Sequence, residues 1–181
     1  HGTFNVESGR YHLYVSHACP WAHRTLITRS LLGLENHISV NVVDWRMNSD
    51  GSWTFNEEEE GATADTVNGE SGIEGIYSRA FDGWKDSHRI GTVPVLWDRH
   101  QDTIVNNESR EIVRMFDEFS KAGLGNGTSL SPPELREEVD TMIDANYESV
   151  NNGVYKSGFA RTQSAYDEAV TALFTRLDEL E

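Results

Sequence analysis

The only cysteine in the chain, Cys19, is followed directly by Pro20 and separates an apolar run from an amphipathic one. A thiol attacks as its thiolate, and a helix N-terminus favours this form through partial positive charge and free N–H groups. His17, His23 and Arg24 are close in sequence and could add positive charge. This arrangement predicts a nucleophilic cysteine at the start of a helix.

Two other roles for Cys19 compete with this one. A free cysteine is most often a small buried side chain, but a position between a strand and a helix favours the reactive role. A zinc site built from His17, Cys19 and His23 lacks the second Cys or His pair that completes a tetrahedral set. We therefore expect a reactive thiol and no metal.

A single cysteine also excludes an intrachain disulfide and a C-x-x-C redox pair. If Cys19 forms a mixed disulfide, the sulfur that resolves it must come from another molecule. A lone thiol suits a reducing compartment, so we expect a cytoplasmic protein.

A thiol that exchanges with a small thiol needs a pocket for it, and the segment "TVPV" could supply one wall. Pro94 lies at the start of an expected strand. A cis bond before Pro94 would turn the Val93 backbone outward to pair with a peptide-like ligand. An ordinary edge proline is the alternative, because only about 5–6% of X–Pro bonds are cis.

Charged and polar residues further along could hold the carboxylates of such a ligand. Glu108 and Ser109 lie at an expected helix N-terminus, where free amides and a hydroxyl bind anions. Simple capping of that helix by Asn107 is equally compatible with the pattern. Arg89 could form a second carboxylate clamp, although an exposed structural arginine is the commoner case.

The elements around Cys19 follow from the apolar pattern. Residues 11–16 read as a strand, and a helix begins at Pro20 and stops at Gly33. Residues 37–45 form a second apolar strand. This order predicts a βαβ unit with parallel pairing.

The next part of the chain changes character. Residues 47–75 are rich in Glu, Gly and Asn and predict a long solvated insertion. A short helix is expected over 77–88, a β-hairpin from 92–98 and 102–106, and a helix over 107–119.

The segment 120–133 is rich in Gly, Ser and Pro and predicts a linker. Ser131 and Glu134 have capping-box spacing around Pro132, which predicts a helix start. Two helices with apolar stripes are expected after it, the second over 166–180. The whole pattern predicts an α/β fold: a thioredoxin-like domain over 1–120, then an all-helical domain over 131–181 that is cut short.

The formal net charge is −15, from 30 acidic and 15 basic residues. Such a surface repels phosphates, which argues against nucleic acid and anionic membranes as partners. Only three of the basic residues are lysines, so the composition favours adaptation to high salt over an ordinary acidic protein. No apolar run approaches the roughly 20 residues that span a bilayer.

The chain resembles the glutathionyl-hydroquinone reductases, the xi class of glutathione transferases, in the segments "GRYHLYVSHACPWAHRTLITRSLLGLE", "SWTF", "HRIGTVPVLWD", "IVNNESREIVRMF" and "NNGVYKSGFARTQSAYDEAV". The similarity covers essentially the whole chain. The "CPWA" turn and the "NGVYKSGFA" run are specific to this class, whereas "VP" and "ES" are shared by glutathione transferases generally.

The resemblance implies that Cys19 is the catalytic nucleophile and that Tyr155 binds the hydroquinone and stabilises its oxygen. It implies glutathione, or another small thiol, as co-substrate, a helical domain that extends beyond Glu181, and a homodimer. The residues that would hold glutathione are Trp53, Arg89, Val93 beside a cis-Pro94, Glu108 and Ser109. Without the resemblance, Trp53 would be read as a loop anchor and Tyr155 as a helix-packing residue.

The predicted function is a glutathione-dependent reductase that removes glutathione from glutathionyl-hydroquinones through a Cys19 mixed disulfide. One alternative is an omega-like thiol transferase or dehydroascorbate reductase that uses the same thiol. The aromatic-rich segment 152–159 disfavours it, because a flat quinol needs a stacking surface. Another is a non-catalytic glutathione-transferase-like interaction module, which the "CPW" helix start disfavours.

Overall fold

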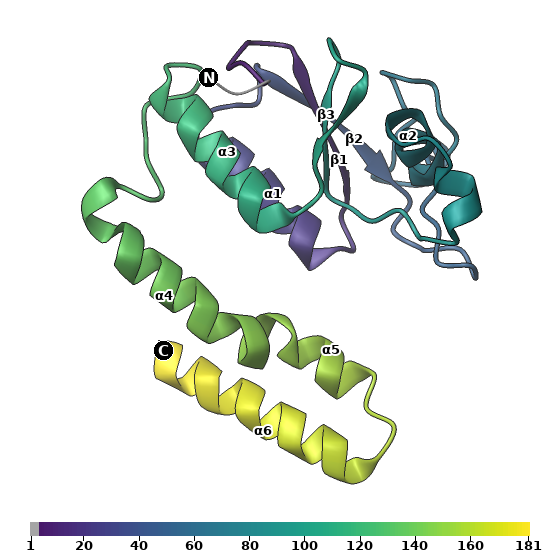
Figure 1. Ribbon diagram of the computed structural model, residues 1–181. Helices are drawn as coiled ribbons and strands as arrows, with labels where there is room; N and C mark the ends of the chain where they lie inside the picture. Colours follow the sequence, from purple (N-terminus) through teal and green to yellow (C-terminus); the bar gives the residue numbers. More distant parts are fainter. Residues whose placement is uncertain (1–3) are drawn as a thin grey trace. The chain divides into compact units, whose positions relative to one another are not determined.

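The computed structural model describes residues 4–181 of the chain (Figure 1). It divides into two compact units, one ending at Leu130 and one spanning Ser131–Glu181. None of the helices in this described part has the length and apolar character needed to cross a bilayer.

The first unit is built on a four-stranded sheet in the order β2-β1-β3-β4. Its strands are β1 (Tyr11–Ser16), β2 (Ile38–Val43), β3 (Val95–Asp98) and β4 (Thr103–Asn106). β1 runs parallel to β2 and antiparallel to β3, and β3 and β4 form an antiparallel hairpin. Every residue of β1 is buried because it has a neighbouring strand on both sides and helices on both faces. Its near-continuous apolar run is typical of such a central strand.

Three helices cover this sheet: α1 (Pro20–Leu31), α2 (Ile73–Ala80) and α3 (Ser109–Lys121). α1 and α3 pack together on one face, and α2 lies on the opposite face (Figure 1). Large side chains fill both interfaces, among them Tyr11, Leu13, Tyr14, Leu32, Ile73, Ile76, Trp97, Ile112 and Phe116. These layers confirm the thioredoxin-like fold expected of the first domain.

A buried ion pair joins the beginning of β1 to the end of β3. Arg10 Nε donates to Asp98 Oδ2 at 2.9 Å, and the other oxygen of Asp98 accepts backbone N–H groups of the hairpin turn. Burial raises the pKa of Asp98, but the hydrogen bonds from Arg10 and the turn outweigh it, so the pKa lies below its ordinary value. The pair therefore fixes the hairpin on the central strand.

The segment after β2 is more than a solvated insertion, so that prediction is wrong in part. Asp65 is buried and accepts a hydrogen bond from the Tyr14 hydroxyl at 2.9 Å. Its two oxygens also accept the backbone N–H groups of Val67, Asn68 and Glu70. One carboxylate thus organises a turn and anchors it on the central strand.

The helix expected over 77–88 is wrong in position. α2 begins at Ile73 and ends at Ala80, because its apolar residues at positions 73, 76 and 77 face the sheet. Gly83 then adopts a positive φ of 73°, and a separate 3-10 turn, η1, covers Trp84–Ser87. The Gly residue separates two short elements where one was expected.

The Gly-rich segment after α3 is fastened to the first unit. Asp117 accepts the backbone N–H of Leu130 at 2.6 Å and the hydroxyl of Ser129 at 3.2 Å. Asn126 donates to the carbonyl of Leu31 at 2.9 Å, at the end of α1. The division between the two units accordingly falls after Leu130.

The second unit contains η2 (Pro133–Leu135), α4 (Arg136–Asn146), a π turn η3 (Tyr147–Asn151), α5 (Gly153–Gly158) and α6 (Gln163–Leu180). α6 packs along α5 and η3. The all-helical character expected of this region is confirmed. Of the two helices expected here, the first is interrupted, because the π turn separates α4 from α5.

The helix start predicted around Pro132 is displaced along the chain. Pro132 is the N-cap of η2, which covers Pro133–Leu135, and α4 begins only at Arg136, where its N-cap, Leu135, has no side-chain cap. α6 instead has a side-chain cap, in which Thr162 accepts the N–H of Ala165.

Candidate active site

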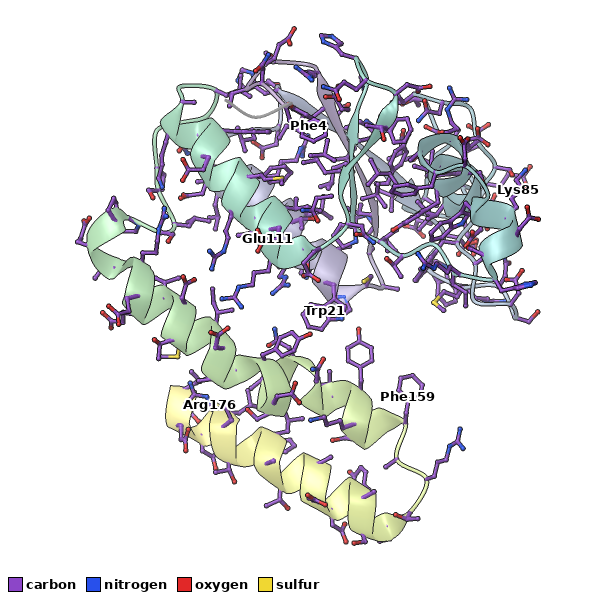
Figure 2. The ribbon with its side chains drawn as sticks, in the orientation of Figure 1. Phe4, Trp21, Lys85, Glu111, Phe159 and Arg176 are labelled. Carbon is purple, nitrogen blue, oxygen red and sulfur yellow. The ribbon has the colours of Figure 1, made fainter. Side chains whose placement is uncertain are left out.

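Cys19 is held at the junction of β1 and α1. It is the N-cap of α1, with extended backbone angles, and Pro20 follows as the first helical residue. Its N–H donates to Ser16 O at 3.2 Å, and its carbonyl accepts the N–H of His23 at 2.9 Å. The neighbouring Trp21 lies at the same N-terminal end of α1 (Figure 2). Strand and helix together fix the backbone that carries the half-buried thiol.

The sulfur lies against the loop that precedes β3. Cys19 Sγ donates to the carbonyl of Val93 at 3.5 Å. Within the described part of the chain it takes no capping hydrogen bond from the amides of α1. The contact brings the thiol beside the backbone that was predicted to pair with a peptide-like ligand.

Val93 and Pro94 are joined by a cis peptide bond. This is the geometry that the ligand-pairing hypothesis requires at this position. Both residues are buried, and β3 begins directly after them.

The N-terminus of α3 is capped by Glu108 rather than by Asn107. Glu108 accepts the N–H of Arg110 at 3.1 Å, while its own N–H donates to the side chain of Asn106 at 2.7 Å. Asn107 turns away from the helix and donates to the Tyr77 hydroxyl at 2.8 Å. The alternative in which Asn107 caps this helix is therefore wrong by one residue.

Arg24 contacts Ser109 at the N-terminus of α3. Its Nε and Nη2 atoms donate to Ser109 Oγ at 2.9 and 2.6 Å, and Nη2 lies 3.5 Å from Glu108 Oε1. The guanidinium also lies over the ring of Trp21, 4.8 Å from its centroid. α1 and the start of α3 are thus linked by one cation.

Tyr77 is a second link that sequence reasoning missed. Its ring is buried and packs on Trp84 with centroids 4.4 Å apart. Its hydroxyl donates to the carbonyl of Thr92 at 3.2 Å and accepts from Asn107. The apolar spacing of α2 indicates that this tyrosine is buried, but nothing local identifies its partners.

Arg89 and Trp53 lie on loops. Arg89 is exposed between η1 and β3, and its N–H donates to Ser87 Oγ at 3.3 Å. Trp53 packs partly against the core, and its carbonyl accepts the N–H of Ile73 at 2.9 Å. Across residues 4–181, neither side chain hydrogen-bonds to the thiol or to the α3 terminus.

Tyr155 belongs to the second unit, where it lies on α5. Its ring stacks on that of Phe159, with centroids 6.3 Å apart and an interplanar angle of 17°. Phe159 is 79% exposed at the C-terminal end of α5 (Figure 2). The two rings form a flat aromatic surface on this unit.

The described residues contain no cluster of three His, Cys, Asp or Glu side chains arranged to hold a metal ion. The structure does bring a thiol to a backbone carbonyl, and a cation to the hydroxyl at a helix terminus. Such a set suits a small anionic thiol ligand.

Residues 18–118 match the family described as glutathione S-transferase, N-terminal domain. The chain belongs to the glutathione S-transferase family. The match covers Cys19, the Val93–Pro94 bond and the α3 terminus.

Similar proteins cover nearly the whole of this chain and carry two kinds of name. A relative named glutathionyl-hydroquinone reductase YqjG, from Escherichia coli, is 50% identical over 99% of this chain and 54% of its own length. A second, named glutathione S-transferase omega-like 2, from Schizosaccharomyces pombe, is 46% identical over 100% of this chain and 58% of its length. The chain therefore spans a little over half the length of these relatives.

Solved structures agree with this membership. The xi-class glutathione transferase of Natrialba magadii superposes with a TM-score of 0.88 at 50% identity, covering 99% of this chain and 55% of that one. The glutathione-bound structure of YqjG gives a TM-score of 0.90 at 49% identity, covering 99% of this chain and 57% of that one. The resemblance to the xi class that the sequence motifs indicated is confirmed.

Proposed function

We propose that this chain carries the thiol site of a glutathione-dependent reductase that removes glutathione from glutathionyl-hydroquinones. The observation that carries the proposal is the contact of 3.5 Å between Cys19 Sγ and the Val93 carbonyl. A peptide-like thiol that pairs with the Val93 backbone brings its own sulfur to Cys19. The names of the relatives supply the class of substrate.

Glutathione suits the rest of the site. Its γ-glutamyl carboxylate would bind the N-terminus of α3 at Ser109, and its amino group would meet Glu108. Arg89 and Trp53 would hold the remainder of the peptide from their loops. The glutathione-bound structure of a relative supports this choice over another small thiol.

The reaction follows from one thiolate and a second thiol. The Cys19 thiolate attacks the sulfur of the conjugate, the bond between that sulfur and the ring carbon breaks, and its electron pair stays on the carbon, which takes a proton. The hydroquinone leaves, and Cys19 remains as a disulfide with glutathione. A second glutathione attacks this disulfide, releases oxidised glutathione and restores the thiolate.

Tyr155 is the proposed quinol-binding residue. The stacked pair that it forms with Phe159 offers a flat apolar surface to an aromatic ring. Its hydroxyl would hold the phenolic oxygen and assist the proton transfer.

The omega-like thiol transferase is the second candidate, because a relative with 46% identity carries that name. It would use Cys19 in the same way on glutathionylated proteins or dehydroascorbate. A non-catalytic module is the third, and it predicts a thiol that forms no adduct with either kind of substrate.

The cellular setting belongs to the proposal as well. A lone reactive thiol and a glutathione co-substrate suit the cytoplasm. The formal charge of −15 suits a salt-rich cell. A homodimer is proposed because glutathione transferases commonly form homodimers. Light scattering at high and low salt would test whether the protein is a homodimer. A monomer under both conditions would contradict the homodimer.

The deciding experiment is the mass of the protein after incubation with glutathionyl-hydroquinone and no second thiol. We expect a gain of one glutathione on Cys19 and release of free hydroquinone, whereas Cys19→Ser should gain nothing and stay folded. A glutathionylated peptide is tested in parallel. A faster adduct from the peptide would favour the thiol transferase, and no adduct from either substrate would favour the module.

A further inference from the structure

The guanidinium of Arg24 occupies the acceptor side of the Ser109 hydroxyl. Two of its N–H groups reach Oγ, at 2.9 and 2.6 Å, from a residue 85 positions away in the sequence. Ser109 is 2% exposed, so this contact is made in a shielded place. A hydroxyl has two acceptor lone pairs and one donor, and both lone pairs here face the same cation.

The consequence is that the Ser109 hydroxyl is available as a donor. It donates to Glu108 Oε1 at a long 3.4 Å. A ligand carboxylate at the N-terminus of α3 would be a better acceptor, because hydrogen bonds to charged groups are shorter and stronger. By occupying the acceptor side of the Ser109 hydroxyl, Arg24 leaves it to act as a hydrogen-bond donor, which suits an anionic ligand.

Charge makes the same residue important over a longer range. The chain carries a formal net charge of −15, and Glu108 adds a carboxylate at the N-terminus of α3. The helix N-terminus offers only about +0.5 of an elementary charge. The full charge of Arg24, placed over Trp21 and against α3, offsets the repulsion that an incoming carboxylate meets.

We propose that Arg24 is a positioning residue that sets the selectivity of this site for thiols carrying a γ-glutamyl carboxylate. It acts through Ser109, which it orients, and through its charge. The proposal rests on the proposed function, because it takes glutathione as the ligand of Cys19, Val93 and the α3 terminus.

Three thiols distinguish binding of the γ-glutamyl end from binding of the glycine end. They are glutathione, γ-glutamylcysteine, which lacks the glycine, and cysteinylglycine, which lacks the γ-glutamyl group. Binding of each reduced thiol is measured by calorimetry under reducing conditions, so that no turnover is needed. In Arg24→Met we expect the Kd of glutathione and of γ-glutamylcysteine to rise about tenfold, as for a lost hydrogen bond to a charged group. The Kd of cysteinylglycine should not change, because it has no γ-glutamyl group.

Two further variants control for the fold. Arg24→Lys keeps the charge but loses the two-pronged contact, so it should restore part of the affinity for the γ-glutamyl thiols. Arg29→Met removes another arginine of α1, whose guanidinium binds the carbonyls of Ile38 and Glu35, and it should leave all three Kd values unchanged.

The outcomes separate the two proposals. If Arg24→Met weakens all three thiols equally, or if Arg24→Lys behaves like Met, Arg24 has no selective role and the inference fails while the glutathione site stands. If the parent protein binds none of the three thiols, the assignment of a glutathione site fails, and this inference fails with it.

Discussion

The side-chain amide of Asn107 donates to the buried hydroxyl of Tyr77 at 2.8 Å. The same hydroxyl donates to the carbonyl of Thr92. Thr92 directly precedes Val93, and Asn107 directly precedes Glu108. One tyrosine on α2 therefore connects the two segments that are proposed to hold opposite parts of glutathione.

Tyr77→Phe should weaken glutathione binding while it keeps the packed ring. Loss of this hydroxyl leaves only the long direct contact of 3.4 Å between Asn107 Nδ2 and Thr92 Oγ1, so the two ligand-binding segments are less well ordered. A hydrogen bond contributes about 0.5–1.5 kcal/mol, which predicts a rise in Kd of about threefold to tenfold. Calorimetry with glutathione measures the change.

Tyr11→Phe is the matched control for this substitution. Tyr11 is equally buried in the same unit, and its hydroxyl donates to the carbonyl of Asn5 at 2.6 Å. The Tyr11→Phe variant should lose a similar free energy of unfolding to Tyr77→Phe, but its Kd for glutathione should equal that of the parent protein. Equal loss of affinity in both variants would mean that Tyr77 acts only through general stability.

His12 should make the fold sensitive to mild acid. It is fully buried beneath Ser39 and Arg99, and within residues 4–181 its Nε2 atom has no partner. Burial, assisted by the charge of Arg99, lowers its pKa from 6.5 to about 4. Below pH 6.5 the unfolded chain binds a proton that the folded chain does not, so stability falls between pH 6.5 and 4, by about 3 kcal/mol.

Chemical denaturation at a series of pH values measures this effect. His12→Gln should flatten the curve between pH 4 and 6.5, whereas replacement of the exposed His100 should not. The lowered pKa values of Asp98 and Asp117 affect stability only below about pH 5, so the fall between pH 6.5 and 5 reports on His12. A parent curve that stays flat from pH 6.5 to 4 would contradict the assignment.

Asp117→Ala should release the segment that ends the first unit. The buried carboxylate holds Ser129 and the N–H of Leu130, and it pairs with Lys121 at 2.7 Å. We expect a loss of about 1–3 kcal/mol and faster proteolysis within 122–130. Glu118→Ala, which removes an exposed carboxylate of the same helix, should be cut at the parent rate, and equal cleavage of both would refute the role of Asp117.

Salt should stabilise the protein through its acidic surface. The Debye length falls from about 30 Å at 0.01 M to about 3 Å at 1 M, which screens the repulsion among the carboxylates. A gain of about 2 kcal/mol would raise the Tm by about 4–8 °C for a chain of this size. Sucrose, which favours the compact state without screening, is the control, and an equal rise in sucrose would remove the electrostatic explanation.

The elements that the sequence predicts well are those with a strong local pattern. The strand over 11–16, the helix start at Pro20 and the hairpin that ends at Asn106 are confirmed, because apolar runs and turn residues determine them locally. The position of α2 and the π turn after α4 were missed. Both features depend on which side chains pack against residues of another helix or strand, and a local sequence pattern does not contain this information.

The long-range contacts of the fold and of the candidate site were harder to anticipate for the same reason. Arg24 and Ser109 are 85 positions apart, Tyr14 and Asp65 are 51 apart, and Tyr77 and Asn107 are 30 apart. Residue type and position indicated that Cys19 could act as a nucleophile and that Ser109 could bind an anion. Only the packing of α1 on α3 and of α2 under the loops determines what each touches.

The separation between Cys19 and Val93 has a consequence for synthesis of the protein. The two are 74 positions apart, so at about 5–20 residues per second Val93 leaves the ribosome about 4–15 s after the thiol. During that interval β1, α1 and β2 are complete in sequence, but the carbonyl that the sulfur contacts does not yet exist. The nascent chain therefore presents an unshielded thiol, and the surroundings in which it is translated, rather than its own fold, must keep that thiol from being oxidised.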